Sequence, residues 1–278
     1  MKQFEVATEK QRGVKSFISR HDAITYPVRN AIGLYSSSFV DFNECWNQGK
    51  FNKDTVAITA EGNPVIYQTM LKNRKKMSAD MRDGLSIVEG QIEDLLYGKM
   101  KPMLCGDQRF NFAFIDFCGH IDAKRFNWFR NELLPNLQTG ASFGVTFNVS
   151  RGVMCRGEDK TLMEWRKRVL RDEPRRLAVG NVFGLESALS TYYSEGKSRN
   201  PFYKHNNDQV VGEVVKNVAW YAMMIYALIN EHFYAANFFT YVYGEPTAMV
   251  LLSAHGLVRR PSNKIATSIM ADCSDLTN

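Results

Sequence analysis

The sequence predicts an α/β protein built on a doubly wound, mostly parallel sheet. Short apolar runs alternate with amphipathic stretches five times within about 150 residues, as parallel strands joined by right-handed crossover helices require. The run Phe112–Phe117 has Asp116 as its only charge, which is typical of a strand buried on both faces. Near the C-terminus, Asn237–Tyr243 and Ala248–His255 flank a turn and indicate an antiparallel hairpin.

The strand and helix signals follow one another in order along the first half of the chain. Ser36, Ser37 and Ser38 have hydroxyl groups that can cap a first helix, which ends near Gly49. A second helix opens at Pro64, where a missing N–H costs nothing. The expected strands are Val28–Tyr35, Thr55–Ala60, Leu85–Val88, Phe112–Phe117 and Ala141–Val149.

Later helices divide the chain into its expected regions. A helix over Ala123–Leu137 is interrupted at Pro135, a charged helix over Glu158–Arg171 is closed by Pro174, and Gln209–Phe233 is a long apolar helix. We therefore expect a single domain that carries a helical and loop insertion. The expected boundaries are an N-terminal lead-in at 1–21, the main domain at 22–256 with its insertion at about 156–208, and a C-terminal tail at 257–278.

Composition narrows the cellular setting. The 278 residues are 45% hydrophobic, and no apolar run approaches the roughly 18 residues that span a membrane. The N-terminus lacks the apolar segment of a signal peptide, so we expect a cytoplasmic protein. Five cysteines without CxxC spacing indicate neither disulfides nor a zinc site, and five scattered histidines offer no metal ligands at workable spacing.

Polar or small residues follow four of the expected strands. These segments are Gly33–Ser38, Glu61, Glu89–Gln91 and Asp116–His120. In open α/β sheets, ligands bind at the carboxyl ends of the strands, and an acid after the second strand can accept hydrogen bonds from ribose hydroxyls. Asp116 has two readings from its position alone: a site residue at this edge, or a cap for the next helix.

Three segments together resemble the class I S-adenosylmethionine-dependent methyltransferases. NFFTYVYGEPTAMVLLSAH is similar to the terminal hairpin of that family's seven-stranded sheet, IVEGQIEDLL to its third-strand segment, and IDFCGH occupies the position of its catalytic-loop motif. The resemblance covers roughly 22–256 and implies a methyltransferase that uses S-adenosyl-L-methionine. AIGLYSSSF departs from the family's glycine-rich first turn, because it holds one glycine, Gly33.

The resemblance assigns expected roles to individual residues. Asp116 would orient or deprotonate the methyl acceptor, and His120 is either a general base or a loop residue. Cys118 is either a nucleophile or a small buried residue beside the site. The expected cofactor-binding residues are Gly33, Tyr35, Ser36, Glu61, Gly62, Gly90, Gln91, Ile92 and Asp116.

Positive charge suggests a polyanionic acceptor. The net charge is +6, and basic residues cluster in RKRVLRDEPRR, where they either track a phosphate backbone or form a solvated helix face. The expected partner is nucleic acid, DNA or RNA. The first alternative is a non-catalytic methyltransferase-like protein that binds nucleic acid or a protein without the cofactor, and a further possibility is an enzyme that acts on small molecules. The expected nucleic-acid-binding residues are Arg166, Lys167, Arg168, Arg175 and Arg176.

Overall fold

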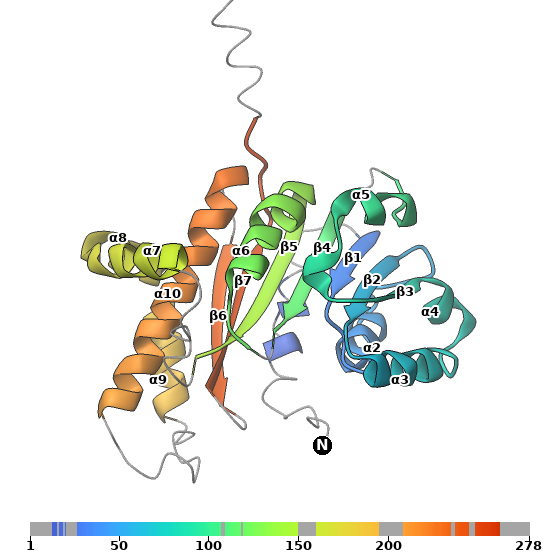
Figure 1. Cartoon of the computed structure of the whole chain (residues 1–278), viewed down its shortest axis with the longest axis horizontal. Coiled ribbons are helices and arrows are strands. Elements are labelled where there is room, and N and C mark those ends of the chain that lie inside the picture. Colours follow the sequence, from blue (N-terminus) through green and yellow to red (C-terminus); the bar gives the residue numbers. More distant parts are fainter. Residues whose placement is uncertain are drawn as a thin grey trace, which may run out of the picture.

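The protein is built on one sheet with helices on both of its faces (Figure 1). The coordinates come from a computed structural model of the whole chain. The structure describes residues 13–15, 17, 18, 20, 27–106, 109–117, 119–149, 160–194, 208–234, 237–244 and 248–261.

The described sheet has seven strands in the order β3-β2-β1-β4-β5-β7-β6. Strands β3, β2, β1, β4 and β5 are parallel to their neighbours, whereas β7 is antiparallel to both β5 and β6. This arrangement confirms the predicted fold class, including the C-terminal hairpin. The strands are β1 (Asn30–Gly33), β2 (Val56–Glu61), β3 (Leu85–Glu89), β4 (Phe110–Asp116), β5 (Leu137–Asn148), β6 (Asn237–Gly244) and β7 (Ala248–His255).

Helices follow the predicted order but differ at two prolines. The helix expected over Ala123–Leu137 is an α-helix only at its start; a π-helical segment and a 3₁₀ turn containing Pro135 complete it. Pro174 lies in the first turn of a new helix, where its missing N–H is harmless. The helices are α2 (Val40–Asn47), α3 (Pro64–Arg74), α4 (Ala79–Asp83), η1 (Ile92–Asp94), α5 (Tyr97–Met100), η2 (Lys101–Met103), α6 (Ala123–Trp128), η3 (Phe129–Leu133), η4 (Leu134–Asn136), α7 (Lys160–Arg171), α8 (Glu173–Phe183), α9 (Leu185–Ser194) and α10 (Asp208–His232).

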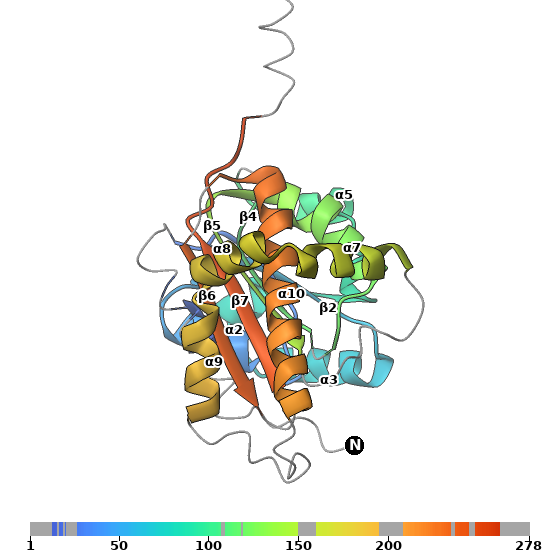
Figure 2. The same ribbon diagram turned by 90° about the vertical axis from the view of Figure 1, so that its left-hand side faces the viewer.

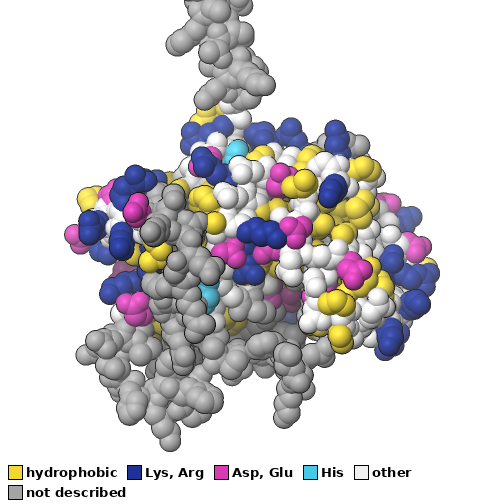
Figure 3. All heavy atoms as spheres, viewed as in Figure 1, with side chains coloured by type: hydrophobic (Ala, Val, Ile, Leu, Met, Phe, Trp, Pro, Cys, Tyr) yellow, Lys and Arg dark blue, Asp and Glu magenta, His cyan; other side chains and the backbone are white. Residues whose placement is uncertain are grey.

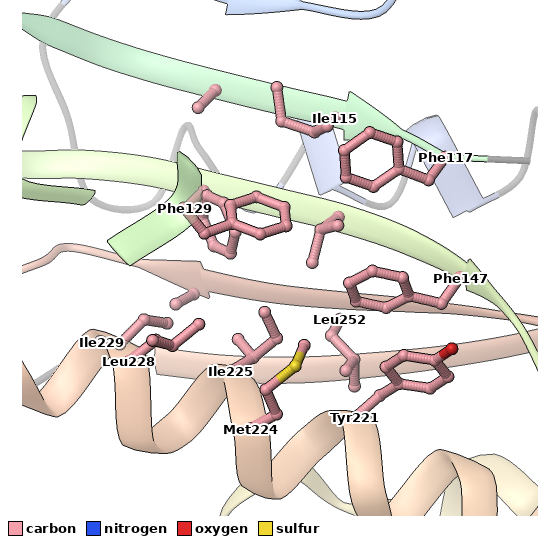
Figure 4. Packing of buried hydrophobic residues seen from close by; sticks show 14 of the residues in the cluster. Ile115, Phe117, Phe129, Phe147, Tyr221, Met224, Ile225, Leu228, Ile229 and Leu252 are labelled. Carbon is pink, nitrogen blue, oxygen red and sulfur yellow. The ribbon is translucent and has the colours of Figure 1, made fainter. Parts of the chain in front are cut away.

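One face of the sheet is covered by α6 and α10. Along α10, Tyr221, Ile225 and Leu228 lie one turn apart on the buried side and contact the strands (Figure 4). The ring of Tyr221 stacks on Phe147 of β5 with centroids 4.2 Å apart. Burying each large side chain contributes about 1.5–3 kcal/mol, so this face fixes α10 against the end of β5.

The other face is covered by α2, α3 and part of the N-terminal segment. Phe17, inside the expected lead-in, is fully buried, with its ring 5.2 Å from that of Phe112 and 5.1 Å from that of Phe114. Gly144 makes room for it, since a Cβ there would lie 2.9 Å from the Phe17 ring. Val14, Phe17 and Ile18 of the expected lead-in therefore belong to the core.

The expected insertion contains three described helices. In Figure 2, α7 and α8 cross α10, and α9 lies beside β6. Phe183 of α8 packs on Phe238 of β6 at 4.7 Å between ring centroids. Residues 195–207 of the expected insertion lie outside the described residues.

Candidate active site

The carboxyl ends of the parallel strands bring the expected site residues to one edge of the sheet. Because β1 lies between β2 and β4, the turn after Gly33 has the segment after Glu61 on one side and Asp116 on the other. Glu61 is directly opposite Glu89 in the pairing of β2 with β3. The order of the strands thus places the two groups of expected residues on either side of β1.

At the ends of β2 and β3, four expected cofactor residues meet. The backbone N–H of Gly90 donates to the carbonyl of Glu61 at 3.0 Å, and Gly90 has a φ of 138°, which favours glycine. The exposed side chain of Gln91 lies across Gly62, since a Cβ on Gly62 would be 2.0 Å from Gln91 Nε2. Gly62 and Gly90 therefore leave the space and the backbone conformation that the Gln91 side chain needs. Ile92, which follows Gln91, is buried.

The Glu61 side chain is held in place by the loop that follows. Its Oε1 accepts a hydrogen bond from the backbone N–H of Asn63 at 2.7 Å. Asn63 in turn caps α3, because its side chain accepts from the backbone N–H groups of Val65 and Ile66. A carboxylate offers about four acceptor positions, so Glu61 retains capacity for further donors.

The turn after β1 is shaped by Tyr35. A Cβ on Gly33 would lie 2.6 Å from the Tyr35 ring, so glycine is required where this side chain packs back on the strand. The Tyr35 hydroxyl is buried without a hydrogen-bond partner among the described residues, and burial raises its pKa well above the ordinary value. Ser36 Oγ lies 3.1 Å from Ser38 Oγ on the same loop.

The prediction that a serine caps the first helix is wrong. The residue at the N-cap of α2 is Phe39, in the left-handed region at φ 55°, and no side chain caps the helix. The buried Phe39 ring belongs to the core under α2, so packing of that side chain outweighs capping chemistry here.

Asp116 stands at the end of β4 beside Thr146 of β5, its partner in the strand register. The Thr146 hydroxyl donates a hydrogen bond to Asp116 Oδ1. The reading of Asp116 as a helix cap is wrong, because α6 begins later and is capped by Asp122, whose side chain accepts from the N–H of Arg125 at 2.8 Å. Asp116 is thus a half-buried carboxylate at the site edge.

His120 lies close to a tyrosine that the sequence did not suggest. Its Nδ1 is 3.4 Å from the hydroxyl of Tyr221 on α10. Burial lowers the pKa of His120 and the charge of Arg125 lowers it further, while the backbone of Asn148 opposes the shift. His120 is therefore neutral at neutral pH and able to accept a proton.

The hydroxyl of Tyr221 stays protonated. Burial raises the pKa of Tyr221, and the backbone of Ile121 and the charges of Arg166 and Arg125 only partly oppose that shift. Figure 4 shows Tyr221 beside Phe147, near the end of the sheet toward which β4 runs. Cys118, the other expected catalytic residue, lies outside the described residues.

Arg125 is a second residue at this edge of the sheet that the sequence did not suggest. Its Nε contacts Glu93 Oε1 at 2.6 Å, its Nη1 donates to the carbonyl of His120 at 2.6 Å, and its guanidinium lies 4.3 Å from the centre of the Phe117 ring. The Glu93 side chain is only 7% exposed. A basic residue in the first turn of a helix does not by itself indicate a functional site. Its pairing with Glu93, two positions after Gln91, could have been inferred only from the order of the strands in the sheet.

The five expected nucleic-acid-binding residues do not share one environment. Lys167, Arg168 and Arg175 are exposed, Arg176 lies 3.8 Å from Glu173, and Arg166 turns inward to donate to Asn217 Oδ1 at 2.7 Å. On the face shown in Figure 3, basic side chains of this region are interspersed with acidic ones. Arg166 is thus set apart from the other four.

The described part of the chain was searched for membrane-spanning helices and for groups of metal-binding side chains. None of its helices is long and apolar enough to cross a membrane. Within the same residues, no group of three or more His, Cys, Asp or Glu side chains is arranged to hold a metal ion.

Comparisons with known proteins found structural likenesses at low sequence identity. No protein-family model matches the sequence, and no curated protein matches it. Among solved structures, cofactor-bound Rv0187 from MTB is 14% identical, with a TM-score of 0.46 over 92% of this chain and 84% of that chain. The O-methyltransferase from Bacillus cereus, in complex with SAH, is 12% identical, with a TM-score of 0.43 over 90% and 82%. The O-methyltransferase TomG from Streptomyces achromogenes, in complex with SAM, is 12% identical, with a TM-score of 0.43 over 91% and 82%.

The fold itself is assigned from the strands of this chain, because those identities and TM-scores are low. The order β3-β2-β1-β4-β5-β7-β6 with β7 antiparallel is the seven-stranded sheet that the resemblance implies. The chain therefore has the class I methyltransferase-like form of the Rossmann fold.

Proposed function

We propose that this protein is an S-adenosyl-L-methionine-dependent methyltransferase. The observation that carries the proposal is the division of one sheet edge by β1. Glu61, Gly62 and Gln91 meet on one side, whereas Asp116 and His120 lie on the other. A cofactor held on the first side would present its reactive group toward the second, as ligands at the strand ends of α/β sheets do.

The residues on the first side fit the nucleoside part of the cofactor. The Glu61 carboxylate, held by the Asn63 N–H, can accept hydrogen bonds from ribose hydroxyls, and the exposed Gln91 amide can donate to and accept from adenine. Gly62 and Gly90 are the glycines that let Gln91 lie there. When bound, S-adenosylmethionine supplies an electrophilic methyl group on a sulfonium.

The turn after β1 would face the methionine part of the cofactor. Tyr35 packs against Gly33 and its hydroxyl is buried, so the polar groups left at this turn are the hydroxyls of Ser36, Ser37 and Ser38 and the backbone. Serine hydroxyls can both donate and accept hydrogen bonds, as a group with an amine and a carboxylate needs. This turn thus uses side chains where a glycine-rich turn would use backbone.

On the acceptor side, Asp116 and His120 have distinct roles. The Thr146 hydroxyl fixes the Asp116 carboxylate, which positions the acceptor. His120 is neutral at neutral pH because burial lowers its pKa, so it can take the proton that an O–H or N–H acceptor loses. Asp116 is therefore the orienting group and His120 the base in this proposal.

Calorimetric titration with S-adenosylmethionine and with its demethylated product tests the cofactor proposal. Glu61→Gln should weaken binding by about tenfold, the effect of weakening a charge-assisted hydrogen bond. Glu89→Gln is the matched control, because Glu89 is the exposed strand partner of Glu61 and should leave affinity unchanged. No binding of either compound at millimolar concentration would favour the non-catalytic alternative.

Radiolabel transfer from S-adenosylmethionine to DNA, RNA, protein or small-molecule extract identifies the acceptor class. If the acceptor is a nucleic acid, the exposed charges of Lys167, Arg168 and Arg175 are the groups that would contact its backbone. In that case, transfer should fall steeply with added salt and with substitution of these residues by glutamine. Transfer to the small-molecule fraction that is insensitive to both would exclude nucleic acid.

A further inference from the structure

We propose that the methyl acceptor is a small molecule with a carboxylate or phosphate group that pairs with Arg166. This inference rests on the proposed methyltransferase function and names the chemical class of its substrate. It comes from three observations: where Arg166 is anchored, what it lacks as a partner, and how it differs from the exposed basic residues beside it.

Arg166 is anchored to the acceptor side of the sheet edge. Its Nη2 donates to Asn217 Oδ1 at 2.7 Å, and Asn217 Nδ2 donates to the carbonyl of Val149, directly after β5, at 3.2 Å. Tyr221 lies one helical turn after Asn217 on the same side of α10, and its hydroxyl faces His120. The guanidinium therefore belongs to the structure that surrounds His120, although α7 is far from it in sequence.

The charge of Arg166 is not neutralised by any described carboxylate. Its hydrogen-bond partner Asn217 is neutral, and its Nε is buried without a partner among the described residues. A buried donor without an acceptor costs free energy. The Arg125 guanidinium avoids this cost because it pairs with the Glu93 carboxylate. An oxyanion on the acceptor would supply the missing negative charge.

The position of Arg166 favours one small oxyanion over a nucleic-acid backbone. A backbone is tracked by exposed cations in series, such as Lys167 and Arg168. Arg166 instead is half-buried, with one nitrogen fixed by a neutral side chain. A planar guanidinium held in this way matches the geometry of a single carboxylate or phosphate.

The test is NMR of protein labelled with ¹⁵N-arginine, titrated with phenyl phosphate and with phenol as its neutral counterpart. The Nε–H signal absent from Arg166→Gln identifies Arg166. Phenyl phosphate should shift that signal saturably, and phenol should not. Arg166→Gln should weaken phenyl phosphate binding, measured by calorimetry, by at least about tenfold, and Arg166→Lys should weaken it less because the charge remains.

Arg171→Gln is the matched control, since it removes the same charge from the same helix at an exposed position and should change affinity less than about twofold. Melting curves establish that each variant is folded. No saturable shift, equal binding of phenol, or a shift only with a short oligothymidylate would overturn the proposal. The titration is done with and without the demethylated cofactor, so failure of cofactor binding and failure of the anion site are seen separately.

Discussion

Replacing Gly62 with alanine tests whether Gln91 binds the cofactor from the position seen in the structure. A Cβ at this position would lie 2.0 Å from Gln91 Nε2, whereas ordinary contact begins at 3.4 Å. The amide must then move by the difference, about 1.4 Å. A displacement of that size breaks a hydrogen bond, whose heavy-atom distance varies only from about 2.7 to 3.2 Å.

The expected loss is that of one net hydrogen bond between neutral groups. At about 0.5–1.5 kcal/mol, Gly62→Ala should weaken binding of the demethylated cofactor by about 2- to 12-fold in calorimetric titrations. The free energy of unfolding should change by less than about 1 kcal/mol, because the displaced atoms are the exposed end of a flexible side chain. Affinity and stability are therefore expected to respond separately.

Three further variants make this prediction specific. Gly98→Ala is the control, since a Cβ there meets nothing within 4 Å, and it should bind the ligand as the wild type does. Gln91→Ala should weaken binding at least as much as Gly62→Ala, and the double variant should be no weaker than Gln91→Ala, because both changes act through one side chain. Additive losses, or wild-type affinity in Gly62→Ala, would refute the assigned role of Gln91.

Three other substitutions test contacts around the site. Asp122→Ala removes the cap of α6 and should lower the free energy of urea unfolding by about 1 kcal/mol; an unchanged midpoint would contradict this. Glu93→Gln leaves the Arg125 guanidinium without its carboxylate partner and should lower the free energy of urea unfolding by about 3 kcal/mol. Asp83→Asn, in an exposed ion pair, is the control and should lower it by less than about 0.5 kcal/mol. The pKa of His120 is lower in the folded than in the unfolded state, so the unfolded state takes up more protons and the free energy of unfolding decreases as the pH falls below about 6.5. His120→Gln should therefore lose less stability than the wild type between about pH 7.5 and 5.5. Melting temperatures that fall in parallel for both proteins over this range would refute the assignment.

The sequence was sufficient to predict the sheet and its site edge because both depend on local patterns. Apolar runs of strand length alternating with helical patterns dictate parallel strands, and the carboxyl ends of such strands meet at one edge. The meeting of Gly62 with Gln91 follows from this topology, although the residues are far apart in sequence. Their roles in binding remain predictions.

Contacts that depend on register and on packing could not be predicted. The partner of Asp116 is Thr146 because the register of β4 with β5 places the two residues opposite each other. A shift of that register by one residue would have placed another side chain beside Asp116. Tyr221, 101 residues from His120, belongs to an apolar helix whose rotation is set by packing on Phe147. Phe39 occupies a helix cap because its ring is needed in the core, which outweighs the local preference for serine.

Arg125 connects the ends of two strands that are not neighbours in the sheet. Its Nε binds Glu93 after β3, while its Nη1 binds the carbonyl of His120 after β4, although β2 and β1 separate those strands in the sheet. A lysine could not satisfy both and also lie on the Phe117 ring, because only a planar guanidinium combines several fixed donors with a flat face. Since Glu93 is two residues from Gln91, the Arg125 side chain connects the proposed cofactor side of the edge to the proposed acceptor side.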